Sequence, residues 1–262
     1  MGTPRWRRAP VPDPHALARR SANRRWDVSI PPVVLLPGMM LDERMYDAQV
    51  ESLSRSREVI VGDLSQSDSI AGLAHDVLRA APSRFALVGL SMGGIVALEI
   101  WRLARDRVTH LGLLDTTPYA EKPDRRELRI EQVAKVESGG LRDVLMTSMK
   151  PLYLSKRNRG NVELLQRILD MAVDLGPDVF RRQSMALRDR PDSTSTLPQI
   201  DCPSLVLCGR EDALCPVEFH VRMAELLPAA DLLVLAGCGH LSTMEAPATV
   251  NAALEHLLGR TS

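Results

Sequence analysis

Two kinds of hydrophobic pattern alternate along the chain. Short apolar runs without a period of two recur from Pro31 onward, and longer amphipathic stretches lie between them. Such runs suit strands that are buried on both faces of a sheet. Strands alternating with helices predict an α/β fold, with a parallel sheet covered by helices on both faces. The runs occupy residues 33–36, 58–64, 85–90, 111–115, 204–208 and 232–235.

The interval of residues 119–199 breaks this alternation. It contains four helix-like segments and no convincing strand, and about eighty residues are too many for a simple crossover between two strands. We therefore expect a small helical cap at 119–199, inserted into a core formed by residues 28–118 and 200–262. The expected cap helices are 126–137, 141–149, 162–175 and 178–187, and the expected core helices are 45–53, 70–80, 94–105 and 217–227.

Composition narrows the class of protein. The 262 residues can form one large core, and 45% hydrophobic with 25% charged residues is ordinary for a globular protein. Lysine plus arginine equals aspartate plus glutamate at 33 each, which indicates neither nucleic acid nor a membrane surface as a partner. Residues 1–27 nevertheless hold seven arginines against two aspartates, and we expect a disordered basic tail there.

Cysteine usage and hydropathy favour a cytoplasmic protein. The four cysteines include no C-x-x-C pair, so we expect reduced thiols rather than a metal or redox site. No apolar run approaches the roughly 20 residues needed to span a bilayer. The N-terminal segment is basic but lacks the apolar centre of a secretory signal.

The sharpest chemical signal is the segment Gly89-Leu90-Ser91-Met92-Gly93, between an apolar run and a helix-like stretch. A serine hydroxyl must project clear of its neighbours to attack a substrate, and a sharp strand-to-helix turn achieves this. The strained turn leaves little room for side chains two positions away, which explains the two glycines. Ser91 is therefore the candidate nucleophile, and the competing interpretation is a purely structural turn.

Two side chains on later loops supply the remaining chemistry. His240 follows the run at 232–235, and its ordinary pKa of about 6.5 suits a group that takes up and returns a proton. Asp212 follows the run at 204–208 and could hold this histidine in the required tautomer. Asp115 is the rival acid, but strand-end aspartates often only bond loop backbone, so we favour Asp212. The other histidines are interpreted as structural: His15, His75, His110, His220 and His256.

An acyl-transfer site also needs backbone N–H groups that bind the developing oxyanion. Met92 follows the nucleophile and should supply one of them. The first loop, residues 36–40, should supply the other, because Gly38 permits a tight turn and Met39 comes next. The side chains of Met39 and Met40 are either core filler or an adaptable apolar rim.

In the order serine, aspartate, histidine, these motifs resemble the α/β-hydrolase family over residues 32–258. The matching segments are Pro37-Gly38, Gly89 to Gly94, Gly209-Arg210-Glu211-Asp212 and Gly237 to His240. The resemblance implies the α/β-hydrolase fold with a mostly parallel sheet. The family's sheet begins with two further strands, for which only residues 26–30 could leave a remnant, so we expect about six strands. The family's first loop often reads His-Gly, and Pro37 replaces that polar side chain here.

The resemblance also implies a mechanism for a carboxylic ester, without a metal or organic cofactor. Ser91 attacks the acyl carbon, the oxyanion rests on the Met39 and Met92 amides, and His240 moves the protons. The cap would form the far wall of the pocket. An aromatic content of 3% argues against a pocket built for aromatic stacking and favours an aliphatic acyl group. Four cap methionines either line that pocket or pack inside the cap: Met146, Met149, Met171 and Met185.

Two other functions stay open. A carbon–carbon bond hydrolase or lyase of the same fold uses the same triad, because fold and triad do not determine the leaving group. A non-catalytic ligand-binding protein on the hydrolase scaffold is a third possibility, although such proteins often lose a triad member. We therefore predict a serine esterase whose partner is a small acyl substrate, and its oligomeric state stays open.

Overall fold

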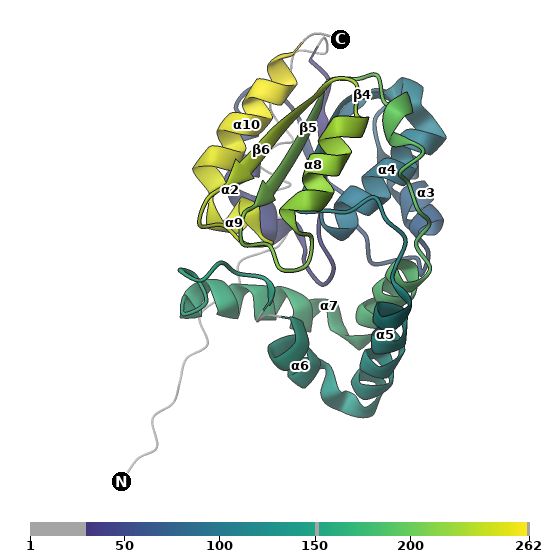
Figure 1. The fold of residues 1–262 in the computed structure, drawn as a ribbon, viewed down its shortest axis with the longest axis vertical. Helices are drawn as coiled ribbons and strands as arrows, with labels where there is room; N and C mark the ends of the chain where they lie inside the picture. Colours follow the sequence, from purple (N-terminus) through teal and green to yellow (C-terminus); the bar gives the residue numbers. More distant parts are fainter. Residues whose placement is uncertain (1–29, 150–151, 261–262) are drawn as a thin grey trace.

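The computed structural model describes residues 30–149 and 152–260, and a six-stranded sheet runs through the main body (Figure 1). The strands lie in the order β2-β1-β3-β4-β5-β6, and every neighbouring pair is parallel. This confirms the expected fold and strand number, while the basic tail and residues 26–29 fall outside the described residues. The bounds are β1 (Val33–Leu36), β2 (Val59–Val61), β3 (Phe85–Leu90), β4 (Val108–Leu114), β5 (Ser204–Gly209) and β6 (Ala230–Leu235).

Burial explains why the strands show no alternating pattern. Every residue of the inner strands β1, β3, β4 and β5 is buried, so both faces of each strand are predominantly apolar. The two edge strands are more exposed, with β2 half-buried throughout and β6 open at Asp231 and Leu232. β2 is also shorter than the apolar run at 58–64 suggested.

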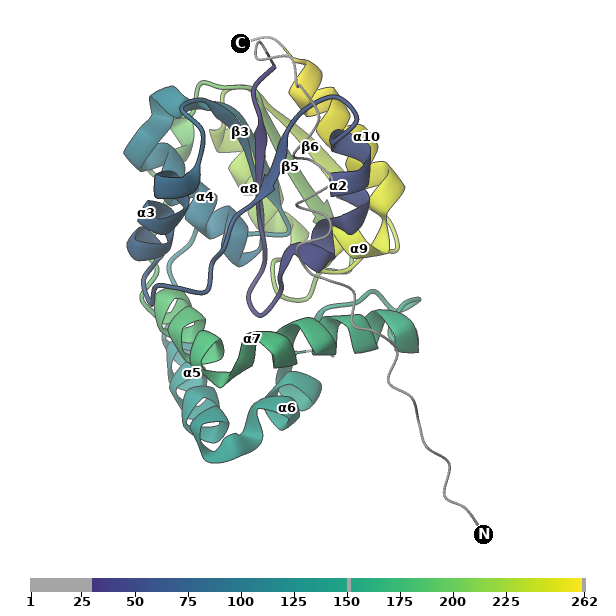
Figure 2. The ribbon, with the colours of Figure 1, turned by 180° about the vertical axis from the view of Figure 1, so that it is seen from behind.

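Helices cover both faces of the sheet (Figure 2). One face packs against α3 (Ile70–Ala80), α4 (Met92–Ala104) and α8 (Val217–Leu226). The other face packs against α2 (Asp47–Leu53) and α10 (Pro247–Gly259), with the short α9 (Ser242–Glu245) beside them. The expected helix at 45–53 begins as a short 3-10 helix at Glu43–Tyr46, which Asp42 caps by accepting from the N–H of Arg44.

The chain between β4 and β5 forms a separate helical layer at one end of the sheet (Figure 1). It contains α5 (Pro123–Lys135), α6 (Leu141–Val144) and the long α7 (Val162–Arg188). The two segments expected at 162–175 and 178–187 are separated within α7 by a kink, where Gly176 has a non-helical conformation with φ 79° and Pro177 follows it. None of the helices in the described ranges has the length and apolar composition that crossing a membrane requires.

Candidate active site

Ser91 occupies a sharp turn between β3 and α4. Its φ of 55° and ψ of −115° lie outside the regions that most residues favour, so the turn is strained. A Cβ atom on Gly89 would overlap the backbone of Gly93, and one on Gly93 would overlap the carbonyl oxygen of Leu36. Glycine is therefore required at both positions, for the steric reason that the sequence motif suggested.

A Gly93→Ala substitution is expected to destabilise the protein by about 3 kcal/mol or more, because its methyl group would meet rigid backbone. Gly160→Ala is the matched control, since a Cβ there meets nothing within 4 Å. Urea unfolding of both variants measures the difference. Equal unfolding midpoints for the two variants would refute the proposed steric requirement.

The three predicted side chains lie in one hydrogen-bonded row. His240, on the loop after β6, has Nε2 at 2.8 Å from the Oγ of Ser91 and Nδ1 at 2.8 Å from an Asp212 carboxylate oxygen. The other oxygen of Asp212 accepts from the N–H groups of Leu214 and Cys215, at 2.8 and 2.9 Å. With Nδ1 donating to Asp212, Nε2 is free to accept the serine proton.

The electrostatics of His240 suit a proton acceptor. Burial lowers its pKa, because the charged ring is removed from water. The negative charge of Asp212 and its hydrogen bond raise the pKa, the charges of Asp115 and Glu245 add to this effect, and the net pKa lies above the ordinary value. Asp212 is therefore placed to orient the ring and to stabilise a positive charge on it.

Asp115, the rival acid, has different partners. Its two carboxylate oxygens accept from the N–H groups of Gly209 and Ser242, each at 3.0 Å. The side chain is fully buried, and burial followed by the nearby charge of Asp212 raises its pKa. Asp115 thus ties together the loops after β5 and β6, on which Asp212 and His240 lie.

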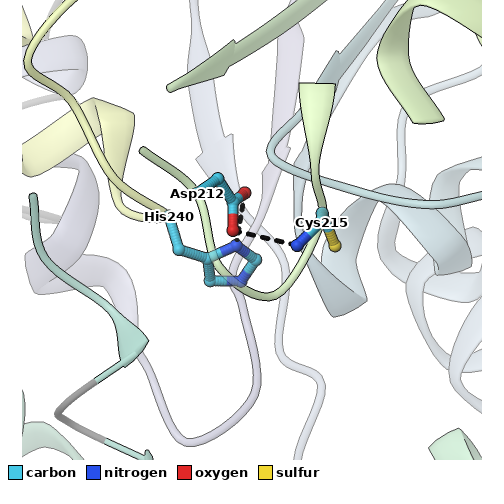
Figure 3. A group of neighbouring side chains, drawn as sticks. All are labelled: Asp212, Cys215 and His240. Carbon is cyan, nitrogen blue, oxygen red and sulfur yellow. Dashed lines mark hydrogen bonds and ion pairs between the residues drawn. The ribbon is translucent and has the colours of Figure 1, made fainter. Parts of the chain in front are cut away.

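Asp212, Cys215 and His240 also lie as close as metal ligands would (Figure 3), with potential ligand atoms within 4.8 Å of one another. Metal binding by cysteine requires the thiolate. Burial and the charge of Asp212 raise the pKa of Cys215 well above its usual range, so the thiol stays protonated. The imidazole nitrogens already face Ser91 and Asp212, so the donor set fits a proton relay better than a metal site.

The first loop lies directly against the turn that carries Ser91. A Cβ on Gly38 would be 3.6 Å from the Cβ of Ser91, and the hydroxyl of Tyr46 donates to the carbonyl of Leu36 at 2.8 Å. The N–H groups of Met39 and Met92 donate to no other residue in the described part of the chain. Both are therefore available to a ligand, as an oxyanion site requires.

The chain between β4 and β5 contacts the first loop and the loop of His240, and the sequence did not predict these contacts. Gln183 in α7 accepts from the N–H of Met40 at 2.8 Å and donates to the carbonyl of Leu64 at 2.9 Å. Ahead of α7, the carbonyl of Tyr153 accepts from the N–H of His240 at 2.8 Å. No local motif marks these residues, because their partners are distant in sequence.

A cavity of about 720 Å³ opens above Ser91 and His240, between the sheet and the helical layer. Three of the chain's nine aromatic side chains line this cavity, although the overall aromatic content is only 3%. Tyr119 and Phe219 pack edge to face, with their ring centroids 5.1 Å apart. The ring centroid of Tyr153 lies 6.1 Å from that of His240. Overall composition conceals such local enrichment. Of the four methionines considered, Met149 lines the cavity.

Comparisons with known proteins find esterases and a lactonase among the similar chains. A pimeloyl-(acyl-carrier protein) methyl ester esterase from Nitrosomonas europaea is 26% identical over 247 residues, covering 83% of this chain and 91% of the relative. A thermophilic esterase from Thermogutta terrifontis, solved with malate bound, superposes with a TM-score of 0.81 at 32% identity, covering 87% of this chain and 89% of that one. An enol-lactonase from Burkholderia xenovorans superposes with a TM-score of 0.78 at 21% identity. The superposition covers 90% of this chain and 94% of the lactonase, which shows that the two share a fold.

The family assignment rests on most of the chain. The sequence model of the alpha/beta hydrolase family matches residues 33–253, which include all six strands and the helical layer. Esterases among the relatives support an enzyme of the hydrolase class. The chain belongs to the alpha/beta hydrolase family.

Proposed function

We propose that this protein is a serine hydrolase that cleaves a small carboxylic ester through an acyl-enzyme intermediate on Ser91. The carrying observation is the row of two 2.8 Å hydrogen bonds that joins Ser91, His240 and Asp212 at the edge of the cavity. A hydroxyl, an imidazole and a buried carboxylate in this order form the arrangement that activates serine. The esterases among its relatives favour an ester as the substrate.

The reaction follows from the geometry in two halves. The Oγ of Ser91 attacks the ester carbonyl while its proton passes to Nε2 of His240, and the resulting oxyanion binds the N–H groups of Met39 and Met92. The imidazolium then protonates the leaving alcohol, and the acyl group stays on Ser91. Water attacks the acyl-enzyme, His240 takes its proton, and the acid leaves with the serine restored.

Turnover of simple substrates tests this proposal. Short p-nitrophenyl esters should be hydrolysed in steady state, whereas a vinylogous diketone, the substrate type of carbon–carbon hydrolases, should be cleaved far more slowly. Each reaction can be followed by absorbance with the same preparation. Preferential cleavage of the diketone would replace the ester proposal with the carbon–carbon alternative, and turnover of neither would favour a ligand-binding role.

The pH profile of kcat/KM should show an acid limb whose midpoint lies above the ordinary histidine pKa of about 6.5. His240 must be neutral to accept the serine proton, and its raised pKa means that activity is lost as pH falls through that higher value. Initial rates of a p-nitrophenyl ester between pH 5 and pH 9, at about ten buffer points, measure the limb. A midpoint below the ordinary value would contradict the stated electrostatics.

A further inference from the structure

The wall of the cavity contains two largely buried arginines that share one carboxylate. Arg129 in α5 and Arg190, just after α7, both pair with Glu121, at 2.7 and 2.9 Å. The side chain of Arg129 is 16% exposed, that of Arg190 is 10% exposed and that of Glu121 is 4% exposed. Two guanidinium groups thus share one carboxylate away from bulk water, and an uncompensated buried charge is unfavourable. This arrangement calls for a second anion.

Arg190 alone satisfies the carboxylate of Glu121. Its two terminal nitrogens donate to the two oxygens at 2.9 and 3.0 Å, and its Nε donates to the carbonyl of Tyr119 at 2.9 Å. Arg129 adds one hydrogen bond, from its Nε to an oxygen that Arg190 already contacts. A purely structural clamp would therefore be complete without Arg129.

The terminal nitrogens of Arg129 are underused. One lies 3.6 Å from the sulfur of Met39, a weak acceptor, and the other donates to no other residue in the described ranges. Burial lowers the pKa of Arg129, Glu121 opposes this effect, and the like charges of Arg190 and Arg125 add to it. Arg129 lines the cavity, and a guanidinium with free terminal N–H groups can bind a carboxylate with bidentate geometry.

Arg129 lies close to the reacting groups. Met39, whose sulfur it contacts, also carries one of the two N–H groups assigned to the oxyanion. Arg129 also lines the same cavity as His240 and Tyr153, whose rings stack on each other. The charged groups lining the cavity are four cations and two carboxylates: Lys122, Arg125, Arg129, Arg190, Glu121 and Asp124.

We propose that Arg129 forms an anion subsite and that the preferred substrate is an ester carrying a second, ionised carboxylate. This inference rests on the proposed ester hydrolysis for its reaction, whereas the subsite itself can be tested by binding alone. The carboxylate would neutralise the excess charge beside Glu121 and hold the ester carbonyl over Ser91. A neutral ester would leave the terminal nitrogens of Arg129 without a strong acceptor, and buried polar groups without partners discriminate strongly against a ligand.

Binding of free straight-chain dicarboxylates, from succinate to suberate, tests the subsite without any turnover. Isothermal titration calorimetry should show binding of at least one length to the wild-type protein, weakened about 10- to 100-fold in Arg129→Gln. Arg126→Gln is the matched control, because Arg126 lies on the same helix but pairs with Asp189 on the surface. It should bind as the wild type does.

Turnover then shows whether the subsite selects the substrate. The monomethyl esters of the same acids should be hydrolysed at least about tenfold more efficiently than their dimethyl esters, and this ratio should collapse in Arg129→Gln. If that variant does not fold, competition by free dicarboxylates against dimethyl ester hydrolysis in the wild type replaces it. The absence of dicarboxylate binding or inhibition, or equal binding by the two arginine variants, would overturn the subsite. Dicarboxylate binding without ester turnover would instead overturn the proposed hydrolysis.

Discussion

A Ser91→Ala variant is expected to lose ester hydrolysis by about 10⁵- to 10⁶-fold in kcat, because no other group in the row can form the acyl-enzyme. The fold should survive, since the only hydrogen bond of the Ser91 hydroxyl shown in the described part of the chain is to His240. The measurement is kcat on a p-nitrophenyl ester, together with thermal melting of both proteins.

Ser138→Ala provides the matched control for this substitution. Ser138 is an exposed serine of the helical layer whose hydroxyl donates to the carbonyl of Lys135 at 2.8 Å, away from the cavity. It should keep wild-type turnover. Retention of more than about a tenth of the activity in a folded Ser91→Ala protein would remove Ser91 from the nucleophile role, given the size of the expected loss.

Asp212→Asn should lower kcat by about 10³- to 10⁴-fold while leaving the fold intact. The asparagine oxygen can still accept from the N–H groups of Leu214 and Cys215, as the carboxylate does now. The neutral amide no longer stabilises the imidazolium and no longer enforces the tautomer with a proton on Nδ1. Steady-state kinetics on the same ester, with unfolding midpoints measured in parallel, separate catalysis from stability.

Asp115→Asn is the comparison that makes this result informative. Asp115 is also fully buried at the same end of the sheet, and its oxygens accept from Gly209 and Ser242. An amide has one oxygen, so this variant should lose a hydrogen bond and some stability while losing far less kcat than Asp212→Asn. A larger catalytic loss in Asp115→Asn would transfer the acid role to that residue.

The sheet can be predicted from local sequence patterns, because each buried strand requires a short apolar run at its own position in the chain. β1 and β3 are continuous apolar runs with the bounds that the sequence suggested. β4 begins at Val108, ahead of the apolar run at 111–115, because Thr109 and His110 interrupt its apolar pattern. The strand-to-helix turn at Ser91 can also be predicted from sequence, because only glycine tolerates the close backbone contacts at positions 89 and 93. The last two members of the row follow strands in a parallel sheet, whose carboxyl ends meet at one edge.

The helical layer is far less predictable, because its important contacts join residues distant in sequence. Arg129 lies in a helix rich in charged residues, and such a pattern is typical of a solvated surface. Its burial depends on Glu121 and Arg190, which lie 8 and 61 positions away in the chain. Gln183 likewise gains its role only when α7 packs against the first loop.

Reaction with a fluorophosphonate, followed by peptide mapping with mass spectrometry, tests the central claim most directly. The probe forms a stable bond only with a serine that its surroundings have activated. We predict a single adduct, located on Ser91, which is retained in Ser138→Ala and absent in Ser91→Ala. An unlabelled wild-type protein, or an adduct on a different residue, would contradict the account.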